Sequence, residues 1–278
     1  MTVVLTWNIQ AGLGCDGVTD LGRIAATIRA RDPDIVCLQE VARNVPEMAG
    51  GEDQVERLAG LFPGHHAVFG AAIDRTGAEQ RMRFGNLVLS RLPVLQVFTH
   101  PLPQPAAPGV KHMPRQATEI VAGTPAGPMR VVTTHLEYHS ETQRIAQAEF
   151  LRRLQAEVEE NAAAPGRDTG TGIYALVPRP ASALYCGDFN AAPGDAVHAL
   201  MTAPLPSGSA LSDAWSVFRP DAPHPPTTGV FDRRQWPQGP HCRDYVFGTA
   251  DLAACIAEVE VDVETDQSDH QPVVLRLG

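Results

Sequence analysis

The sequence predicts an α/β fold, and three observations support this prediction. Short apolar segments rich in β-branched residues recur along the whole chain, with segments of helical periodicity between them. Most of the apolar segments are continuous rather than alternating, which is typical of strands covered on both faces. No linker separates two parts of different composition, so we expect a single domain over residues 1–278.

The apolar segments predict seven strands. Their expected ranges are Val3–Trp7, Ile35–Leu38, Leu87–Leu89, Val131–Thr134, Ala183–Cys186, Tyr245–Phe247 and Val273–Leu277.

Three helices are expected between these strands. The first follows the capping residue Asp20 and ends at Asp32 and Pro33; the second spans Asp53–Leu61, and the third follows Ser140. Three segments rich in proline and glycine are expected to be surface loops. These segments are His100–Pro114, Ala162–Pro180 and Pro220–Pro240.

Composition limits the classes of function. The formal net charge of −10 argues against a general nucleic-acid coat protein, because duplex binders usually carry a basic surface. Five cysteines without a CxxC pair predict free thiols rather than a disulfide framework or a zinc site. The first residues lack the pattern of a signal peptide, and no apolar run is long enough to span a membrane. We therefore expect a cytoplasmic protein without stable membrane insertion.

Polar residues that can titrate or bind a metal recur at the ends of the predicted strands. In open α/β sheets, ligands gather where strands end and loops begin. Taken alone, each residue has an ordinary explanation: Asn8 could cap a turn, Glu40 could be a solvated acid, and His135 could be a buried core histidine. Six strand ends would each need a separate explanation, so their joint occurrence favours a functional site. The residues are Asn8, Glu40, His135, Asp188, Asn190, Asp244, Asp269 and His270.

The chemistry of these residues indicates a divalent metal and a phosphate ester. Carboxylate and amide oxygens without thiolates suit Mg²⁺ or Mn²⁺ better than zinc, and Glu40 with Asp269 could hold such an ion. Hydrolysis of a phosphodiester also needs hydrogen-bond donors around the phosphoryl group, and an activated water. Asn8, Asn190 and His135 are candidate donors. His270 is the candidate base, with Asp244 fixing its tautomer.

Together, the motifs resemble those of the endonuclease/exonuclease/phosphatase superfamily, the group with the fold of pancreatic deoxyribonuclease. The segments TWNIQ, PDIVCLQEV, FGNLVLSRLP, THLE, CGDFNAAPGD, RDYVF and SDH stand in the order typical of that family and cover nearly the entire chain. The resemblance implies a four-layer α-β-β-α sandwich of two packed mixed sheets, with the site at one edge of both sheets.

The resemblance also implies roles for individual residues. Glu40 becomes the main metal ligand, assisted by Asp269, and Asn8 becomes a metal or phosphate contact. The remaining strand-end residues become catalytic, namely His135, Asp188, Asn190, Asp244 and His270.

Substrate contacts are expected at residues near these positions. Asn86 matches a position that often lines the phosphate pocket, and Arg243 stands where an aliphatic residue is more usual. Arg115 and Trp236 are further candidates. Gln10 replaces an acid that some nuclease members carry, so one ion is expected and a second is left open. The loops Ala162–Pro180 and Pro220–Pro240 are expected to form the specificity rim.

The predicted function is metal-dependent hydrolysis of a phosphate ester, with a small phosphodiester favoured over nucleic acid because the chain is acidic. Two alternatives stay open. One is a DNA endonuclease, exonuclease or tyrosyl-DNA phosphodiesterase-like repair enzyme, and the other is an inactive member that binds phosphorylated ligands. The sequence does not identify a protein partner.

Overall fold

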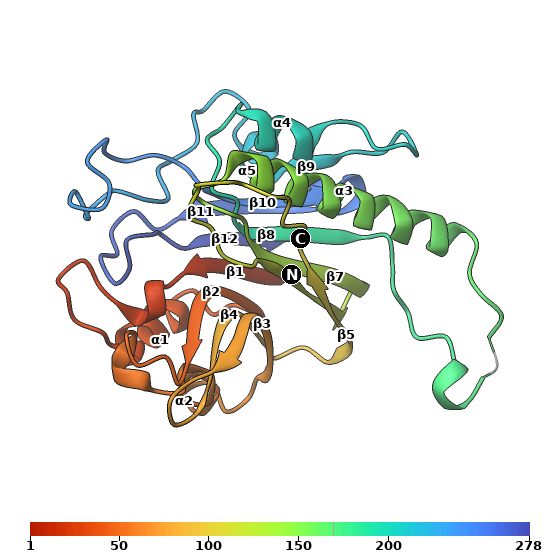
Figure 1. Ribbon diagram of the computed structural model, residues 1–278. Coiled ribbons are helices and arrows are strands. Elements are labelled where there is room, and N and C mark those ends of the chain that lie inside the picture. Colours follow the sequence, from red (N-terminus) through yellow and green to blue (C-terminus); the bar gives the residue numbers. More distant parts are fainter. Residues whose placement is uncertain (169) are drawn as a thin grey trace.

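Two six-stranded mixed sheets pack face to face in the computed structural model, which describes residues 1–168 and 170–278 (Figure 1). In sheet order, the first sheet contains β11 (Ile256–Val261), β12 (Val273–Leu277), β1 (Thr2–Asn8), β2 (Ile35–Arg43), β4 (Arg81–Ser90) and β3 (His66–Thr76). The second contains β5 (Val94–Pro101), β6 (Gln116–Thr124), β7 (Gly127–His135), β8 (Ala183–Asp188), β10 (Asp244–Thr249) and β9 (Leu211–Asp213).

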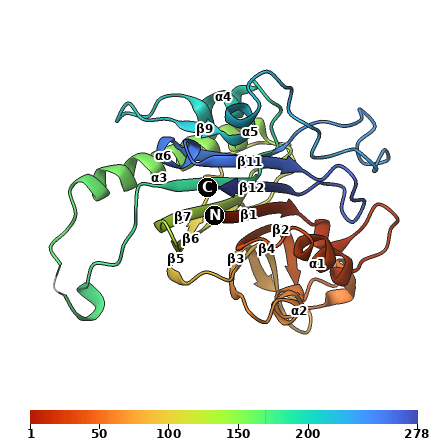
Figure 2. The same ribbon diagram turned by 180° about the vertical axis from the view of Figure 1, so that it is seen from behind.

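Helices cover the outer faces of both sheets, which produces the predicted α-β-β-α layers (Figures 1 and 2). The helices are α1 (Leu21–Arg29), α2 (Gln54–Leu61), α3 (Glu141–Ala163), α4 (Ala196–Thr202), α5 (Ala214–Phe218) and α6 (Ala250–Ala253). One cluster of apolar side chains fills the space between the two sheets. A second cluster packs the first sheet against α1 and α2, and a third packs the second sheet against α3 and α4. Three 3₁₀ turns are η1 (Gln10–Gly12), η2 (Ala49–Gly51) and η3 (Gly172–Tyr174).

The three predicted helices are confirmed, and each begins with a side-chain cap. Asp20 accepts hydrogen bonds from the backbone of α1, Asp53 from that of α2 and Ser140 from that of α3. These caps satisfy amide groups that the first turn of a helix leaves unpaired. No helix of the described residues combines the length and apolar character that crossing a membrane requires.

Five strands were not predicted, namely β3, β5, β6, β9 and β11. Strand β5 alternates between more and less exposed residues at the edge of its sheet, so it lacks a continuous apolar run. All three predicted loops also need correction. Residues His100 and Pro101 belong to β5, and Ala162 and Ala163 belong to α3. The Pro220–Pro240 segment contains the buried residues Thr227 and Trp236.

Glu119 in β6 is a fully buried carboxylate that several cations surround. It accepts hydrogen bonds from Arg130 at 2.9 Å and from Arg179 at 2.9 and 3.0 Å. The Nε2 atom of His100 lies 2.8 Å from its Oε2 atom. Burial alone would raise the pKa of Glu119, but His100 and the two arginines outweigh burial and hold the pKa far below its usual range.

We expect Glu119→Gln to lower the free energy of unfolding at neutral pH by about 3–5 kcal/mol, because it leaves the buried Arg130 without a counter-charge. Since the folded-state pKa is depressed, this contribution is present above about pH 4.3 and is lost as the pH falls through the folded-state value. Urea unfolding at neutral and acidic pH measures both effects. The control is Glu149→Gln, which breaks the exposed pair with Arg153 and should cost less than about 1 kcal/mol. Equal losses in both variants would contradict the prediction.

Candidate active site

The polar residues at the strand ends meet at one edge of the two sheets. Each sheet contains one parallel pair, β1 with β2 and β7 with β8, and polar residues follow or end these strands. Asn8 at the end of β1 donates a hydrogen bond of 3.1 Å to Asp188 at the end of β8. It donates another of 3.0 Å to Glu40. The amide of Asn8 therefore joins the first sheet to the second and holds two carboxylates close together.

Unusual backbone conformations place two of these carboxylates. The pairing of β2 with β4 shifts register between Leu38 and Val41, and Glu40 within this bulge has a φ of 58°. Bulges of this kind redirect a side chain next to an active site. Gly187 has a φ of 132°, and an added Cβ would lie 2.0 Å from the carbonyl oxygen of Thr134. Only glycine allows β8 to approach β7 this closely, directly before Asp188.

Asp188 lies at the centre of the site. Its Oδ2 atom is 3.3 Å from Nε2 of His135 and 3.7 Å from Nε2 of His270, while Oδ1 accepts the backbone N–H of Asn190 at 2.9 Å. Burial would raise the pKa of Asp188, but the two histidines and this hydrogen bond lower it. Burial, followed by the charge of Arg115, lowers the pKa of His135 to about 3. His135 is therefore a neutral hydrogen-bond donor at physiological pH.

His270 and Asp244 form a buried hydrogen-bonded pair. The Nδ1 atom of His270 lies 2.8 Å from Oδ2 of Asp244, and the Thr227 hydroxyl donates to the same oxygen at 2.6 Å. Burial alone would lower the pKa of His270, but Asp244, Asp269 and Asp188 outweigh it and raise the pKa well above its usual value. Burial raises the pKa of Asp244 to about 6. The pair is arranged to stabilise a proton on the ring of His270.

Asp269 is held by the Pro220–Pro240 segment, which was predicted to form part of the specificity rim. Its Oδ2 atom accepts hydrogen bonds from Gln235 at 2.9 Å and from the indole N–H of Trp236 at 3.0 Å. Trp236 is only 3% exposed, and its ring packs against His270 with the centroids 6.0 Å apart. Trp236 therefore positions Asp269, and its predicted contact with substrate stays a prediction.

The donor set at this edge fits a hard divalent cation. Burial raises the pKa of Glu40, and the charge of Asp269 raises it further, so the two carboxylates repel each other without an ion between them. Oxygen donors of this kind suit Mg²⁺ and Mn²⁺. Glu40 and Asp269 are therefore the residues that would hold the ion. One ligand atom each from Asp188, Asp244 and His270 also lies within 4.8 Å of the other two, and Nδ1 of His270 is hydrogen-bonded to Oδ2 of Asp244.

A scan against protein-family models matches residues 5–270 to the endonuclease/exonuclease/phosphatase family. The chain belongs to this family. The match includes all the strand-end residues from Asn8 to His270. A search of curated proteins finds no match.

Several solved structures are similar in fold to this chain. An endonuclease/exonuclease/phosphatase from Beutenbergia cavernae DSM 12333 is 27% identical, with a TM-score of 0.68 over 100% of this chain and 72% of the other. The mannosyl-6-phosphatase of Bacteroides thetaiotaomicron VPI-5482 is 16% identical, with a TM-score of 0.65 over 100% of both chains. The 3' phosphatase NExo from Neisseria, bound to product DNA hairpin, is 19% identical, with a TM-score of 0.63 over 100% of both. The last two likenesses, at their low identity, show the fold alone.

The other residues predicted to contact substrate differ in solvent exposure. Asn86 is buried between the sheets, where its amide faces the backbone carbonyls of Gln116 and Thr133 at 3.3 and 3.5 Å. Arg115 donates to Glu137 at 3.4 Å. Arg243 is partly exposed, donates to His241 at 2.7 Å and lies over the rings of Tyr138 and Trp236. Arg243 is therefore a partly exposed residue, and its guanidinium lies over the ring of Trp236, which packs against His270.

One predicted part of the specificity rim is wrong. The Ala162–Pro180 segment leads into the amino end of β8, whereas Asp188 lies at the carboxyl end of that strand. Figure 1 shows the described parts of this segment, residues 162–168 and 170–180, extending away from the strand ends that carry the site; residue 169 lies outside the described residues. Sequence reasoning also missed Thr227 and Gln235, because nothing in the spacing of these loop residues indicates their contacts with Asp244 and Asp269.

Proposed function

We propose that this chain is a Mg²⁺- or Mn²⁺-dependent phosphoric ester hydrolase, with a small phosphodiester as its substrate. The observation that carries the proposal is the convergence of Glu40 and Asp269 with Asp188 and the His270–Asp244 pair at one edge of the sheets. The family match and the phosphatases of the same fold support phosphoester chemistry.

The residues of the chain have distinct tasks in this reaction. In its neutral form, His270 takes a proton from the attacking water at Nε2, while Asp244 fixes the ring through Nδ1 and stabilises the resulting imidazolium. Asp188 orients the water, and neutral His135 donates a hydrogen bond toward the phosphoryl group. A bound divalent ion would neutralise charge on the phosphoryl oxygens, which lowers the barrier by several kcal/mol.

A cavity next to the site supports a small substrate. Its volume is about 240 Å³, and Glu40, Arg115 and His135 line the side toward the catalytic residues. Apolar side chains, among them Met82 and Phe84, line the rest together with further arginines. Cavities that combine apolar walls with a few polar groups commonly bind small molecules. The cavity suits an anionic group joined to an apolar one.

The response of activity to salt tests the substrate class. We expect turnover of a small diester such as bis-p-nitrophenyl phosphate to change less than about threefold between low and physiological ionic strength. A nuclease that contacts several phosphates along a strand should instead lose activity by orders of magnitude, because each contact releases counterions. Initial rates on the small diester and on a DNA hairpin, measured side by side with Mn²⁺, make the comparison. Faster and steeply salt-dependent cleavage of the hairpin would overturn the small-substrate proposal.

A repair nuclease is the second candidate, since the Neisseria 3' phosphatase of this fold was solved with a DNA hairpin. The partly exposed Arg243, whose guanidinium lies over the rings of Tyr138 and Trp236, is the feature that could meet a nucleotide. An inactive member that only binds phosphorylated ligands is disfavoured by the intact His270–Asp244 pair. Metal-dependent turnover of any substrate in a panel of phosphate esters would exclude it.

A further inference from the structure

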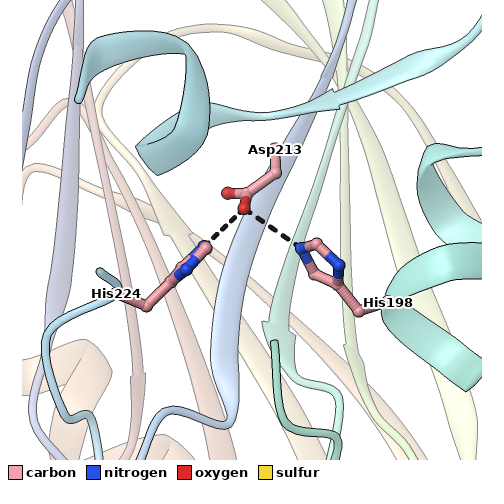
Figure 3. Close-up of side chains that lie close together, drawn as sticks. All are labelled: His198, Asp213 and His224. Atoms are coloured by element: carbon pink, nitrogen blue, oxygen red, sulfur yellow. Dashed lines mark hydrogen bonds and ion pairs between the residues drawn. The ribbon is translucent and has the colours of Figure 1, made fainter. Parts of the chain in front are cut away.

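A second group of metal-binding side chains lies outside the candidate active site (Figure 3). His198 comes from α4, Asp213 from the end of β9, and His224 from the segment after α5. The Nε2 atoms of both histidines face Oδ2 of Asp213, at 3.1 Å from His198 and 2.5 Å from His224. One ligand atom of each residue lies within 4.8 Å of the other two.

One carboxylate oxygen of Asp213 is surrounded by more donors than its lone pairs accommodate. Oδ1 of Asp213 caps α5 by accepting the backbone N–H of Trp215 at 3.1 Å. Oδ2 faces both histidines and also accepts the hydroxyl of Ser216 at 2.8 Å. Three donors therefore meet on one oxygen, whereas a carboxylate oxygen offers about two lone-pair positions. A cation between the ring nitrogens and the carboxylate would remove this excess of donors.

We propose that His198, Asp213 and His224 bind a Zn²⁺ ion, with one water as the fourth ligand. Two imidazoles and a carboxylate form a donor set that zinc favours. In a tetrahedral zinc site, ligand atoms about 2.0–2.1 Å from the metal lie about 3.3 Å apart. The separation of 3.1 Å between His198 and Asp213 is close to this value. The separation of 2.5 Å between His224 and Asp213 is shorter, so the ring of His224 has to move away from Asp213 to admit the ion.

The surroundings favour a structural ion over a second catalytic centre. The side chains of His198 and His224 are 15% and 12% exposed, which gives an ion access from solvent. The cavity that borders Asp213 and His224 has a volume of about 20 Å³, enough for about one water and too small for a substrate. The ring of Tyr245 packs against both histidines, with centroids 5.3 and 5.6 Å apart, and fixes their orientation.

The ion would fasten the loop that supports the active site. Three residues after His224, Thr227 donates its hydroxyl to Asp244, the partner of His270. Tyr245, which packs against both zinc-binding histidines, directly follows Asp244 in β10. A zinc ion at this place would therefore join α4, β9 and the loop that holds the His270–Asp244 pair.

Zinc titration of the Glu40→Gln protein tests the proposal, because this change removes the main ligand expected in the active site. Isothermal titration with ZnCl₂ should show one equivalent of bound Zn²⁺. Adding His198→Asn or His224→Asn should abolish this equivalent. Adding His100→Gln should leave it unchanged, since His100 is also paired with a buried carboxylate, Glu119, but has no second histidine beside it among the residues that the structure describes.

Two further readouts separate loss of the site from loss of the fold. The Tm of the Glu40→Gln protein should rise by several degrees with ZnCl₂, whereas the Tm of the His224→Asn double variant should not move. Zinc-edge anomalous diffraction from Glu40→Gln crystals should place a peak between His198, Asp213 and His224, and this readout needs no change in the cluster. The proposal is overturned if the Glu40→Gln protein binds no zinc, if His224→Asn keeps the same stoichiometry, or if the anomalous peak lies elsewhere. The position of the anomalous peak tests the zinc site whether or not the phosphoesterase proposal holds.

Discussion

Replacing His270 with alanine is expected to reduce turnover of a phosphodiester by about 10²- to 10⁴-fold. The ring of His270 lies 2.8 Å from Asp244 and 3.7 Å from Asp188, so its removal deletes the group that takes the proton from water. The effect should fall on kcat, because the ring acts in the transition state rather than in binding. Steady-state kinetics with Mn²⁺ measure it, and urea unfolding verifies that the variant is folded.

A double-mutant cycle separates this role from a merely structural one. Asp244→Asn should lower kcat by itself, and the double variant with His270→Ala should be no slower than His270→Ala alone, because Asp244 acts through His270. His65→Ala is the control, since His65 lies beside Phe62 after α2 and contacts no site residue that we describe. Additive losses for Asp244 and His270 would show that the two residues do not act as a unit.

Glu40→Gln is expected to weaken the apparent affinity for Mn²⁺ by more than about 100-fold, because even groups that only support a metal ligand commonly contribute 10- to 100-fold. The variant keeps an oxygen that can accept the hydrogen bond from Asn8, so it removes charge with little change of shape. Activity at saturating Mn²⁺ should recover in part. Titration of activity with Mn²⁺ measures the change, and the exposed Glu56→Gln serves as the control.

The same variant should behave differently without metal. Burial and the charge of Asp269 raise the pKa of Glu40, so the ionised carboxylate costs stability in the metal-free protein at neutral pH. In EDTA we therefore expect the Tm of Glu40→Gln to equal or exceed that of the wild type, and in Mn²⁺ to fall below it. A lower Tm in both conditions would show that Glu40 supports the fold instead of an ion.

The grouping of the strand-end residues could be predicted because polar residues that can bind a metal or titrate stand at the ends of several apolar strands. Asn8, His135 and Asp188 each end a buried strand, where a polar residue has few partners unless other strand ends meet it. The helix caps were predictable for a similar reason, since capping depends on neighbours in the sequence.

Other features depend on contacts between distant segments, and the sequence does not indicate them. Trp236 reads as a loop residue at the surface, yet its indole N–H binds Asp269 from a segment 33 residues away. His198, Asp213 and His224 lie on three separate elements, and their spacing matches no metal motif. Strand β5 was missed because half of it faces solvent.

Hydrolysis of bis-p-nitrophenyl phosphate as Mn²⁺ is removed and restored tests the central claim most directly. We predict turnover by the wild-type protein that EDTA abolishes and excess Mn²⁺ restores, and no turnover by Asp188→Asn under either condition. Turnover that persists in EDTA, or an Asp188→Asn protein as active as the wild type, would contradict the assignment of this edge of the two sheets as a metal-dependent phosphoesterase site.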